Sequence, residues 1–150
     1  MMAALVACGL TFGASTVRAA EGECWTAQLL VDKAISHYKA VGQEKAFADF
    51  MDKGNPGWVN NGHYVVVSTM DGIFKTHTVN PKFIDNTDLP MLKDTDGILI
   101  IQEMVKAGKS GPDGAWAKYT WVHPEAKKWV PKHTWVKPSG ELLFMDSCYP

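Results

Sequence analysis

The sequence predicts an α+β domain in which helices come first and an antiparallel sheet of about five strands follows. Apolar residues recur at helical spacing between Cys24 and Val41, and at a period of two from residue 63 onward. Short turn sequences separate the later segments. Because 150 residues suffice for one core but not for two, we expect a single domain over residues 20–150.

Three helices are expected. The first, residues 24–41, is long and has one apolar face, made by Ala27, Leu30, Ala34, Tyr38 and Val41. Gly42 interrupts it, and residues 43–51 form a second, shorter helix. Residues 97–108 form the third, with Asp96 or Thr95 as the predicted N-cap.

The strands are predicted from alternation and turn chemistry. Residues 63–70 and 73–79 flank Asp71-Gly72, a strong signal for a two-residue hairpin. Residues 80–96 form an irregular connection, long enough to suggest a functional role. Three more strands follow at about residues 115–123, 128–137 and 141–149.

The first 19 residues are expected to form a secretory signal peptide. They are small and apolar, have no charge before Arg18, and end with small residues at Val17 and Ala19. A buried N-terminal helix is the alternative interpretation. A lipid anchor on Cys8 is not expected, because almost no apolar run precedes that cysteine. We therefore expect a periplasmic or secreted protein.

Without that leader the chain has no arginine, and its formal charge changes from −1 to −2 because Arg18, the only arginine, is lost. This composition argues against a nucleic-acid partner, which is usually bound by basic excess and arginine. Cys24 and Cys148 remain at the two ends of the domain. Two cysteines in an exported protein suggest a disulfide, with two unpaired thiols as the alternative.

Residues 114–135 contain four of the six tryptophans, interleaved with lysines. In the strand around residue 119, alternation directs Trp116 to one face, and Tyr119 and Trp121 to the other. Neither face is purely apolar or purely polar. Such a mixture is typical of a small-molecule pocket, although aromatic packing under a covering loop would also produce it.

Residues 25–150 resemble the single Cache domains, which are extracytoplasmic sensor modules of bacterial receptors. The matching positions are Asp71-Gly72, His77, Pro81, Asp94, Gly97, Glu103, Trp116, Tyr119, Trp121, Pro131-Lys132 and Tyr149-Pro150. The resemblance implies a PAS-like fold with a long N-terminal helix behind the sheet and a ligand cavity under the covering loop. It also implies that both ends of the domain lie close together, as a bridge between the two cysteines requires.

The resemblance also implies a ligand site. The residues transferred as pocket lining are His77, Trp116, Tyr119, Trp121 and Lys132. The expected ligand is a small carboxylate, an amino acid or an amine. Lys132 would pair with an acid group, Tyr119 and His77 would hydrogen-bond, and the tryptophans would form apolar walls or, around a cation, part of an aromatic cage. Alternatively, Lys132 is a solvated strand residue and His77 a structural histidine.

No enzyme, cofactor or metal site is expected. Ser36 and Lys39 match an S-x-x-K spacing without its accompanying motifs, and His123 and His133 lack a third ligand. No transmembrane segment or output module flanks the domain, so a free-standing sensor or carrier is expected, with a membrane receptor or other signalling protein as partner. An interaction or structural module that has lost its ligand is the competing hypothesis.

Overall fold

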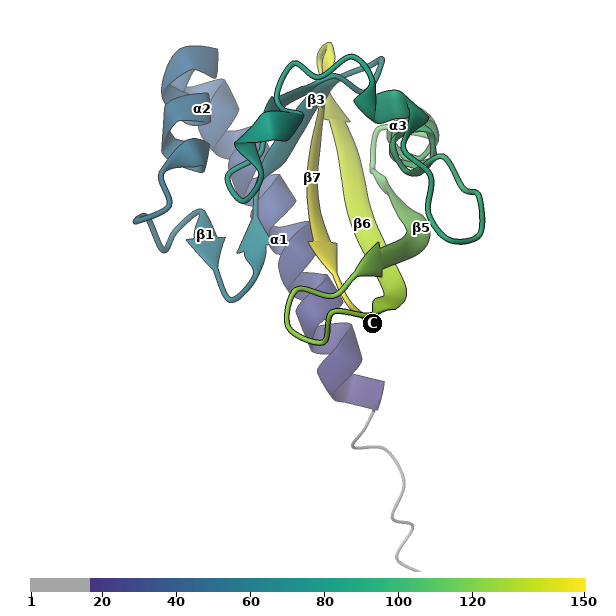
Figure 1. The fold of residues 1–150 in the computed structure, drawn as a ribbon. Helices are drawn as coiled ribbons and strands as arrows, with labels where there is room; N and C mark the ends of the chain where they lie inside the picture. Colours follow the sequence, from purple (N-terminus) through teal and green to yellow (C-terminus); the bar gives the residue numbers. More distant parts are fainter. Residues whose placement is uncertain (1–16) are drawn as a thin grey trace, which may run out of the picture.

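The computed structural model describes the backbone of residues 17–150 and the side chains from residue 24 onward. Most of the predicted leader, with Cys8, lies outside the described residues. The described part of the chain begins with two helices and continues through short strands, a third helix and three long strands (Figure 1). The elements are α1 (Val17–Val41), α2 (Gln43–Met51), β1 (Val59–Asn60), β2 (His63–Tyr64), β3 (Val66–Thr69), β4 (Phe74–Thr76), η1 (Pro81–Phe83), η2 (Leu89–Met91), α3 (Ile100–Lys109), β5 (Ala115–Val122), β6 (Trp129–Ser139) and β7 (Leu142–Cys148).

The main sheet has five strands in the order β4-β3-β7-β6-β5, and all neighbouring pairs are antiparallel. The last strand, β7, therefore lies in the middle of the sheet, between β3 and β6. The predicted α+β class, the long first helix and the five-stranded antiparallel sheet are confirmed.

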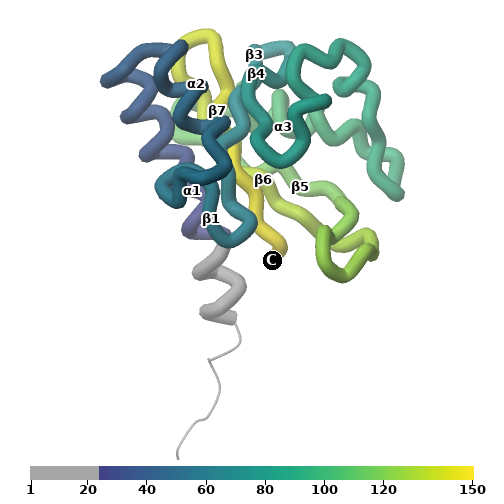
Figure 2. Tube along the Cα trace, turned by 60° about the vertical axis from the view of Figure 1, so that its left-hand side comes forward, coloured from purple at the N-terminus to yellow at the C-terminus, as the bar shows by residue number. Residues whose placement is uncertain are grey.

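One face of this sheet is covered by α1 and α2 (Figures 1 and 2). The buried residues between these helices and the sheet are Val31, Ala34, Ile35, Ala46, Phe50, Trp58, Val65, Val67 and Phe144. The rings of Phe50 and Trp58 meet edge to face at 4.9 Å, and Tyr38 contacts Phe144 at 5.2 Å. Large aromatic side chains thus fill the space between these helices and the sheet.

The opposite face is covered by α3 and by the connection from β4 to α3 (Figure 1). Helix α3 lies close to the sheet at Gly108, where a Cβ atom would come within 2.5 Å of the Leu143 side chain. The cluster on this face contains Val66, Phe74, Leu89, Ile100, Ile101, Met104, Val105, Ala107, Ala117, Tyr119, Val136, Leu143 and Met145. The β4–α3 connection is therefore a structural cover for this side of the sheet.

The structure differs from the prediction in three places. The strand expected at residues 73–79 is shorter, because β4 comprises only Phe74–Thr76. The expected strand 63–70 is divided, because His63 and Tyr64 pair with Val59 and Asn60 in a separate two-stranded sheet. Helix α3 begins at Ile100 after Leu99, so the predicted cap at Asp96 or Thr95 is wrong. The Asp94 carboxylate explains this later start.

That carboxylate accepts hydrogen bonds from the backbone N–H groups of Asp96 and Ile98, and from Thr120 on β5. Gly97 then turns the chain with a φ of 82°. The residues before α3 form a tight loop fixed to the edge of the sheet, so the helix begins only when this loop ends. These backbone hydrogen bonds also lower the pKa of Asp94, although burial of the carboxyl opposes them.

The predicted disulfide between Cys24 and Cys148 is present, with the two Cα atoms 5.1 Å apart. It joins the N-terminal part of α1 to the last residue of β7. Among the described residues, no helix has both the length and the hydropathy that crossing a membrane requires.

Candidate functional site

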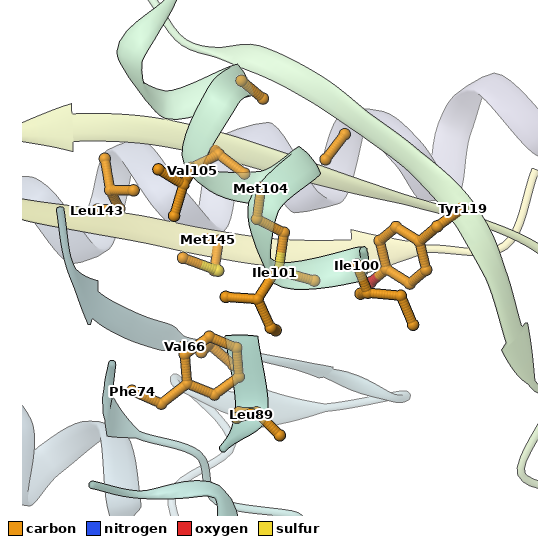
Figure 3. Close-up of a cluster of buried hydrophobic side chains, with 13 residues drawn as sticks. Val66, Phe74, Leu89, Ile100, Ile101, Met104, Val105, Tyr119, Leu143 and Met145 are labelled. Atoms are coloured by element: carbon orange, nitrogen blue, oxygen red, sulfur yellow. The ribbon is translucent and has the colours of Figure 1, made fainter. Parts of the chain in front are cut away.

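A cavity of about 140 Å³ lies between the sheet and the cover formed by the β4–α3 connection and α3. Its deep wall is apolar and includes Val66, Phe74, Leu89, Ile100, Ile101, Met104 and Met145, which Figure 3 draws together. Its polar side consists of Tyr64, His77, Asn80, Tyr119, Lys132, Thr134 and Ser147. Several of these polar residues adjoin one another: the rings of Tyr64 and His77 are 5.2 Å apart, and Tyr119, Thr134 and Ser147 form a chain of hydroxyl groups. We call this side of the cavity its polar end.

Four of the five predicted site residues line this cavity: His77, Tyr119, Trp121 and Lys132. They come from three places in the chain, since His77 follows β4, Tyr119 and Trp121 lie on β5, and Lys132 lies on β6. The register pairs Tyr119 directly with Lys132. The sheet thus brings these four side chains together, and their role as ligand contacts remains a prediction.

Trp116 does not line the cavity, so its assignment to the pocket requires correction. It is three residues from Tyr119 on the same strand, and alternation directs it to the other face. There its ring contacts Trp135 edge to face at 5.1 Å and His133 at 6.3 Å. Trp116 belongs to the aromatic packing on the α1 side of the sheet.

The ammonium of Lys132 lies between two rings at the polar end of the cavity. Its Nζ atom is 5.8 Å from the centroid of Trp121 and 5.2 Å from that of Tyr149. Within residues 24–150 it makes no ion pair with a carboxylate. Burial lowers the pKa of Lys132 to about 8, because a charged amine is less stable away from water, while Asp146 opposes this shift.

His77 is buried among aromatic rings, and its protonation state follows from its contacts. Its Nδ1 atom accepts a hydrogen bond from the backbone N–H of Asn80 at 3.0 Å. In the neutral ring the proton therefore lies on Nε2. Burial, with the charge of Lys132 as a smaller cause, lowers the pKa of His77 to about 4. At neutral pH the ring is an uncharged donor.

Tyr119 is buried, and its hydroxyl is already engaged. It hydrogen-bonds to Thr134 at 2.7 Å, and Thr134 in turn contacts Ser147 at 2.8 Å. Burial raises the pKa of Tyr119 to about 12, so the phenol remains protonated. This hydroxyl chain crosses β5, β6 and β7 and fixes the ring at the cavity wall.

Tyr64 is a cavity residue that the sequence interpretation missed. It lies on β2 beside Val66, contacts the ring of His77 at 5.2 Å, and its pKa is raised mainly by burial. Alternation within residues 63–70 directs Tyr64 and Val66 to the same face. That pattern could have identified Tyr64 if the face had been assigned to the cavity.

A wider groove of about 850 Å³ adjoins the cavity and shares Tyr64, Val79, Trp121, Lys132 and Ser147 with it. Its other walls come from α1, the β1–β2 hairpin, the β5–β6 turn and the C-terminus. Lys132 therefore lies where the small apolar cavity meets the open groove.

Acidic groups are absent from the cavity wall in the part of the chain that the structure describes. The nearest buried carboxylate, Asp146, accepts hydrogen bonds from His63 Nδ1 at 2.6 Å and from the backbone N–H of Tyr64. Among residues 24–150, no cluster of three histidine, cysteine or acidic side chains could hold a metal ion. The described lining of the site can therefore donate hydrogen bonds and place a positive charge beside a ligand.

The sequence profile of the family described as single Cache domain 2 matches residues 21–142. The chain belongs to the single Cache domain family. The match covers most of α1, the β4–α3 connection and strands β3 to β6 of this Cache domain, and it ends at the first residue of β7. No curated protein matches the chain significantly.

Solved structures similar to this Cache domain share its fold. One is a methyl-accepting chemotaxis protein from Vibrio parahaemolyticus RIMD 2210633, with 15% identity, a TM-score of 0.70, and 89% of this chain and 92% of that chain covered. Another, titled "Structural basis for carboxylic acid recognition by a Cache chemosensory domain", has 19% identity, a TM-score of 0.67, and covers 91% and 99%. A periplasmic sensor domain of a chemotaxis protein has 20% identity, a TM-score of 0.61, and covers 89% of each chain.

Proposed function

We propose that this Cache domain is a periplasmic sensor or carrier that binds a small monocarboxylate in the cavity behind Lys132. Membership of the family supports a sensing role. One similar structure bears a title on carboxylic acid recognition, and another is a periplasmic sensor domain. A membrane receptor or another signalling protein is the partner we propose for passing on the signal.

The observation that most supports an anionic ligand is the chemistry of the polar end of the cavity. Three groups there have no hydrogen-bond or ion-pair partner within residues 24–150: the ammonium of Lys132, Nε2 of His77 and the hydroxyl of Tyr64. All three can donate hydrogen bonds to a carboxylate. Among the described residues that line the cavity, an amine or amino acid would find no acidic side chain for its ammonium group. We therefore favour a carboxylate over both of these classes.

The size and the apolar end of the cavity limit the rest of the ligand. Its volume of about 140 Å³ is well below the ~300 Å³ at which drug-sized pockets begin. The deep wall consists of aliphatic and aromatic side chains, where a second charge would be strongly disfavoured. A short hydrocarbon chain with one carboxylate meets both conditions.

The competing hypothesis, a module without a ligand, predicts that side chains fill this space. The open cavity and its unpaired donors support the binding role instead. A thermal-shift screen distinguishes the binding role from the module without a ligand. It tests residues 20–150 against short monocarboxylates, dicarboxylates, amino acids and amines. A ligand at 100 times its Kd stabilises the protein by about 2.7 kcal/mol, a readily measured shift in Tm.

Lys132→Met tests the ligand assignment directly. This substitution keeps an unbranched side chain but removes the charge, so the thermal shift with propionate is expected to disappear. Lys118→Met is the matched control, because Lys118 is exposed on the same hairpin and alternation directs it to the opposite face. We expect the control to bind as the unchanged protein does.

Two results would contradict the proposal. The first is a complete absence of stabilisation by monocarboxylates under conditions where the protein is folded. The second is equal affinity of the Lys132→Met and Lys118→Met variants for propionate, which would remove Lys132 from the site.

A further inference from the structure

The C-terminal end of the chain lies beside the ammonium of Lys132. Strand β7 ends at Cys148, and Tyr149 follows it outside the sheet. The ring centroid of Tyr149 lies 5.2 Å from Lys132 Nζ and 4.6 Å from the ring of His123. Tyr149 lines the groove and not the cavity, so its ring lies over the ammonium on the groove side.

Tyr149 lies just beyond the strand pairing of the sheet. The last residue of β7 that pairs with β6 is Cys148, opposite His133. Beyond that point the Tyr149 ring contacts His123, a half-buried residue between β5 and the following turn. The residue before Tyr149 is held covalently, by the disulfide from Cys148 to Cys24 on α1.

The same bridge fixes the wall of the groove. Helix α1 contributes Thr26 and Leu30 to that wall, and the C-terminal segment contributes Cys148 and Tyr149. In Figure 1 the C-terminus lies at the same end of the molecule as the beginning of α1. The disulfide thus joins the two segments that enclose Lys132 from the groove.

We propose that the Cys24–Cys148 disulfide holds Tyr149 over the ammonium of Lys132, and that ligand affinity consequently depends on the oxidation of this cysteine pair. Tyr149 is a positioning residue in this arrangement, because it acts on the ligand through Lys132. The inference about affinity rests on the proposed function, whereas the inference that the disulfide holds Tyr149 over Lys132 does not.

The physical reason is the effect of water on an ion pair. A ring over the ammonium excludes water, and the attraction between two charges increases as the local dielectric falls. If the C-terminus is released, water reaches Lys132 and the ion pair with a carboxylate weakens. The lowered pKa of Lys132 agrees with this burial.

Release requires a dithiol reductant and proceeds by exchange. A thiolate of the reductant attacks one sulfur of the bridge, and the other protein sulfur leaves as a thiolate that takes up a proton. The second thiol of the reductant, after deprotonation, then attacks the mixed disulfide. The products are Cys24 and Cys148 as thiols and the reductant as its disulfide, so the electrons balance.

The test compares three variants of residues 20–150. The first is the double variant Cys24→Ala/Cys148→Ala, the second is Tyr149→Ala, and the third is Tyr149→Phe, the matched control that keeps the ring. Calorimetric titration with propionate is expected to give about tenfold weaker binding for the first two and unchanged binding for the control. Near-UV circular dichroism verifies that each variant is folded at the temperature used. Tyr149→Ala retains the disulfide, so it tests the ring without loss of the cross-link.

A second measurement needs no ligand. The titration of the Lys132 amine, followed by NMR at its side-chain carbon and assigned with Lys132→Met, is expected near pH 8 in the unchanged protein. Its midpoint should rise in the disulfide-free and Tyr149→Ala variants. If that rise occurs but propionate binds none of the proteins, the proposed function fails and the positioning role stands. Folded variants with unchanged propionate affinity and an unchanged Lys132 titration would overturn the inference.

Discussion

The two faces of the central sheet are packed very differently. On the α1–α2 side, Phe50, Trp58 and Phe144 interlock and fill the core. On the α3 side, a cavity remains between the strands and their cover. One surface therefore stabilises the domain by close packing, while the other retains space and unpaired donors.

Because of this difference, one face of the sheet contributes mainly to stability and the other mainly to ligand binding. No fully buried side-chain nitrogen or oxygen in residues 24–150 lacks a partner. The unpaired donors of His77, Tyr64 and Lys132 thus reach open space within the cavity or at its mouth. Substitutions on the filled face should change the free energy of unfolding, and substitutions on the hollow face should mainly change binding.

The largest expected effect is on the filled face. Phe50→Ala removes a fully buried ring that contacts Trp58 and Phe144, and it should reduce the free energy of unfolding by about 3–5 kcal/mol. Phe83→Ala, which trims a partly buried ring beside His77 on the hollow face, should cost less than half as much. Urea denaturation measures both, and equal losses would show that the two faces are packed alike.

Two adjacent valines test the difference between the two faces of the sheet. Val65 is fully buried on the filled face, whereas Val66 lines the cavity. Val65→Phe overpacks the core and should destabilise the domain by about 1–3 kcal/mol. Val66→Phe should fill the cavity instead, with little change in stability but no binding of propionate. Retained binding in Val66→Phe would place the ligand elsewhere.

The buried His77 makes the hollow face sensitive to acid. Its pKa is about 4 in the folded protein, below the ordinary value of 6.5. Between these values the unfolded chain binds more protons, so stability present above pH 6.5 is lost as the pH falls. From pH 7 to pH 5 the unchanged protein should lose about 2 kcal/mol more than His77→Gln. Parallel losses in both proteins, measured by urea denaturation, would contradict the burial of a neutral ring.

The smallest effect is the pH dependence of binding through Lys132. Because its pKa is about 8, the ammonium is largely present at pH 7 and largely lost at pH 9. Propionate affinity should therefore fall about tenfold over this range, a free-energy change of about 1.4 kcal/mol. Calorimetric titration in buffers of matched ionic strength measures it. Constant affinity across the range would mean that the charge of Lys132 does not bind the acid.

Much of the architecture could be predicted from local pattern. The change of period from 3.6 to two located the helices and strands, and Asp71-Gly72 located the β3–β4 turn, where Gly72 has a φ of 86°. The disulfide was predicted from two cysteines and the compartment. For the helices, the strands and the turn, the information lies within a few neighbouring residues, whereas the two cysteines are 124 residues apart in sequence.

The site was predicted less completely, because it depends on which face of each strand meets the cover. Alternation showed that Trp116 and Tyr119 point in opposite directions, but the family resemblance placed both in the pocket. Tyr64 was missed because the face that it shares with Val66 was not assigned to the cavity. The late start of α3 depends on the contact between Asp94 and Thr120, which are far apart in sequence.

The central place of β7 has a consequence for how the domain is made. The strand that joins β3 to β6 is the last one in the sequence, so the β3–β4 and β5–β6 hairpins have no common partner until it is available. During synthesis the emerging polypeptide cannot close its sheet, and it reaches the native state only after the final strand leaves the ribosome.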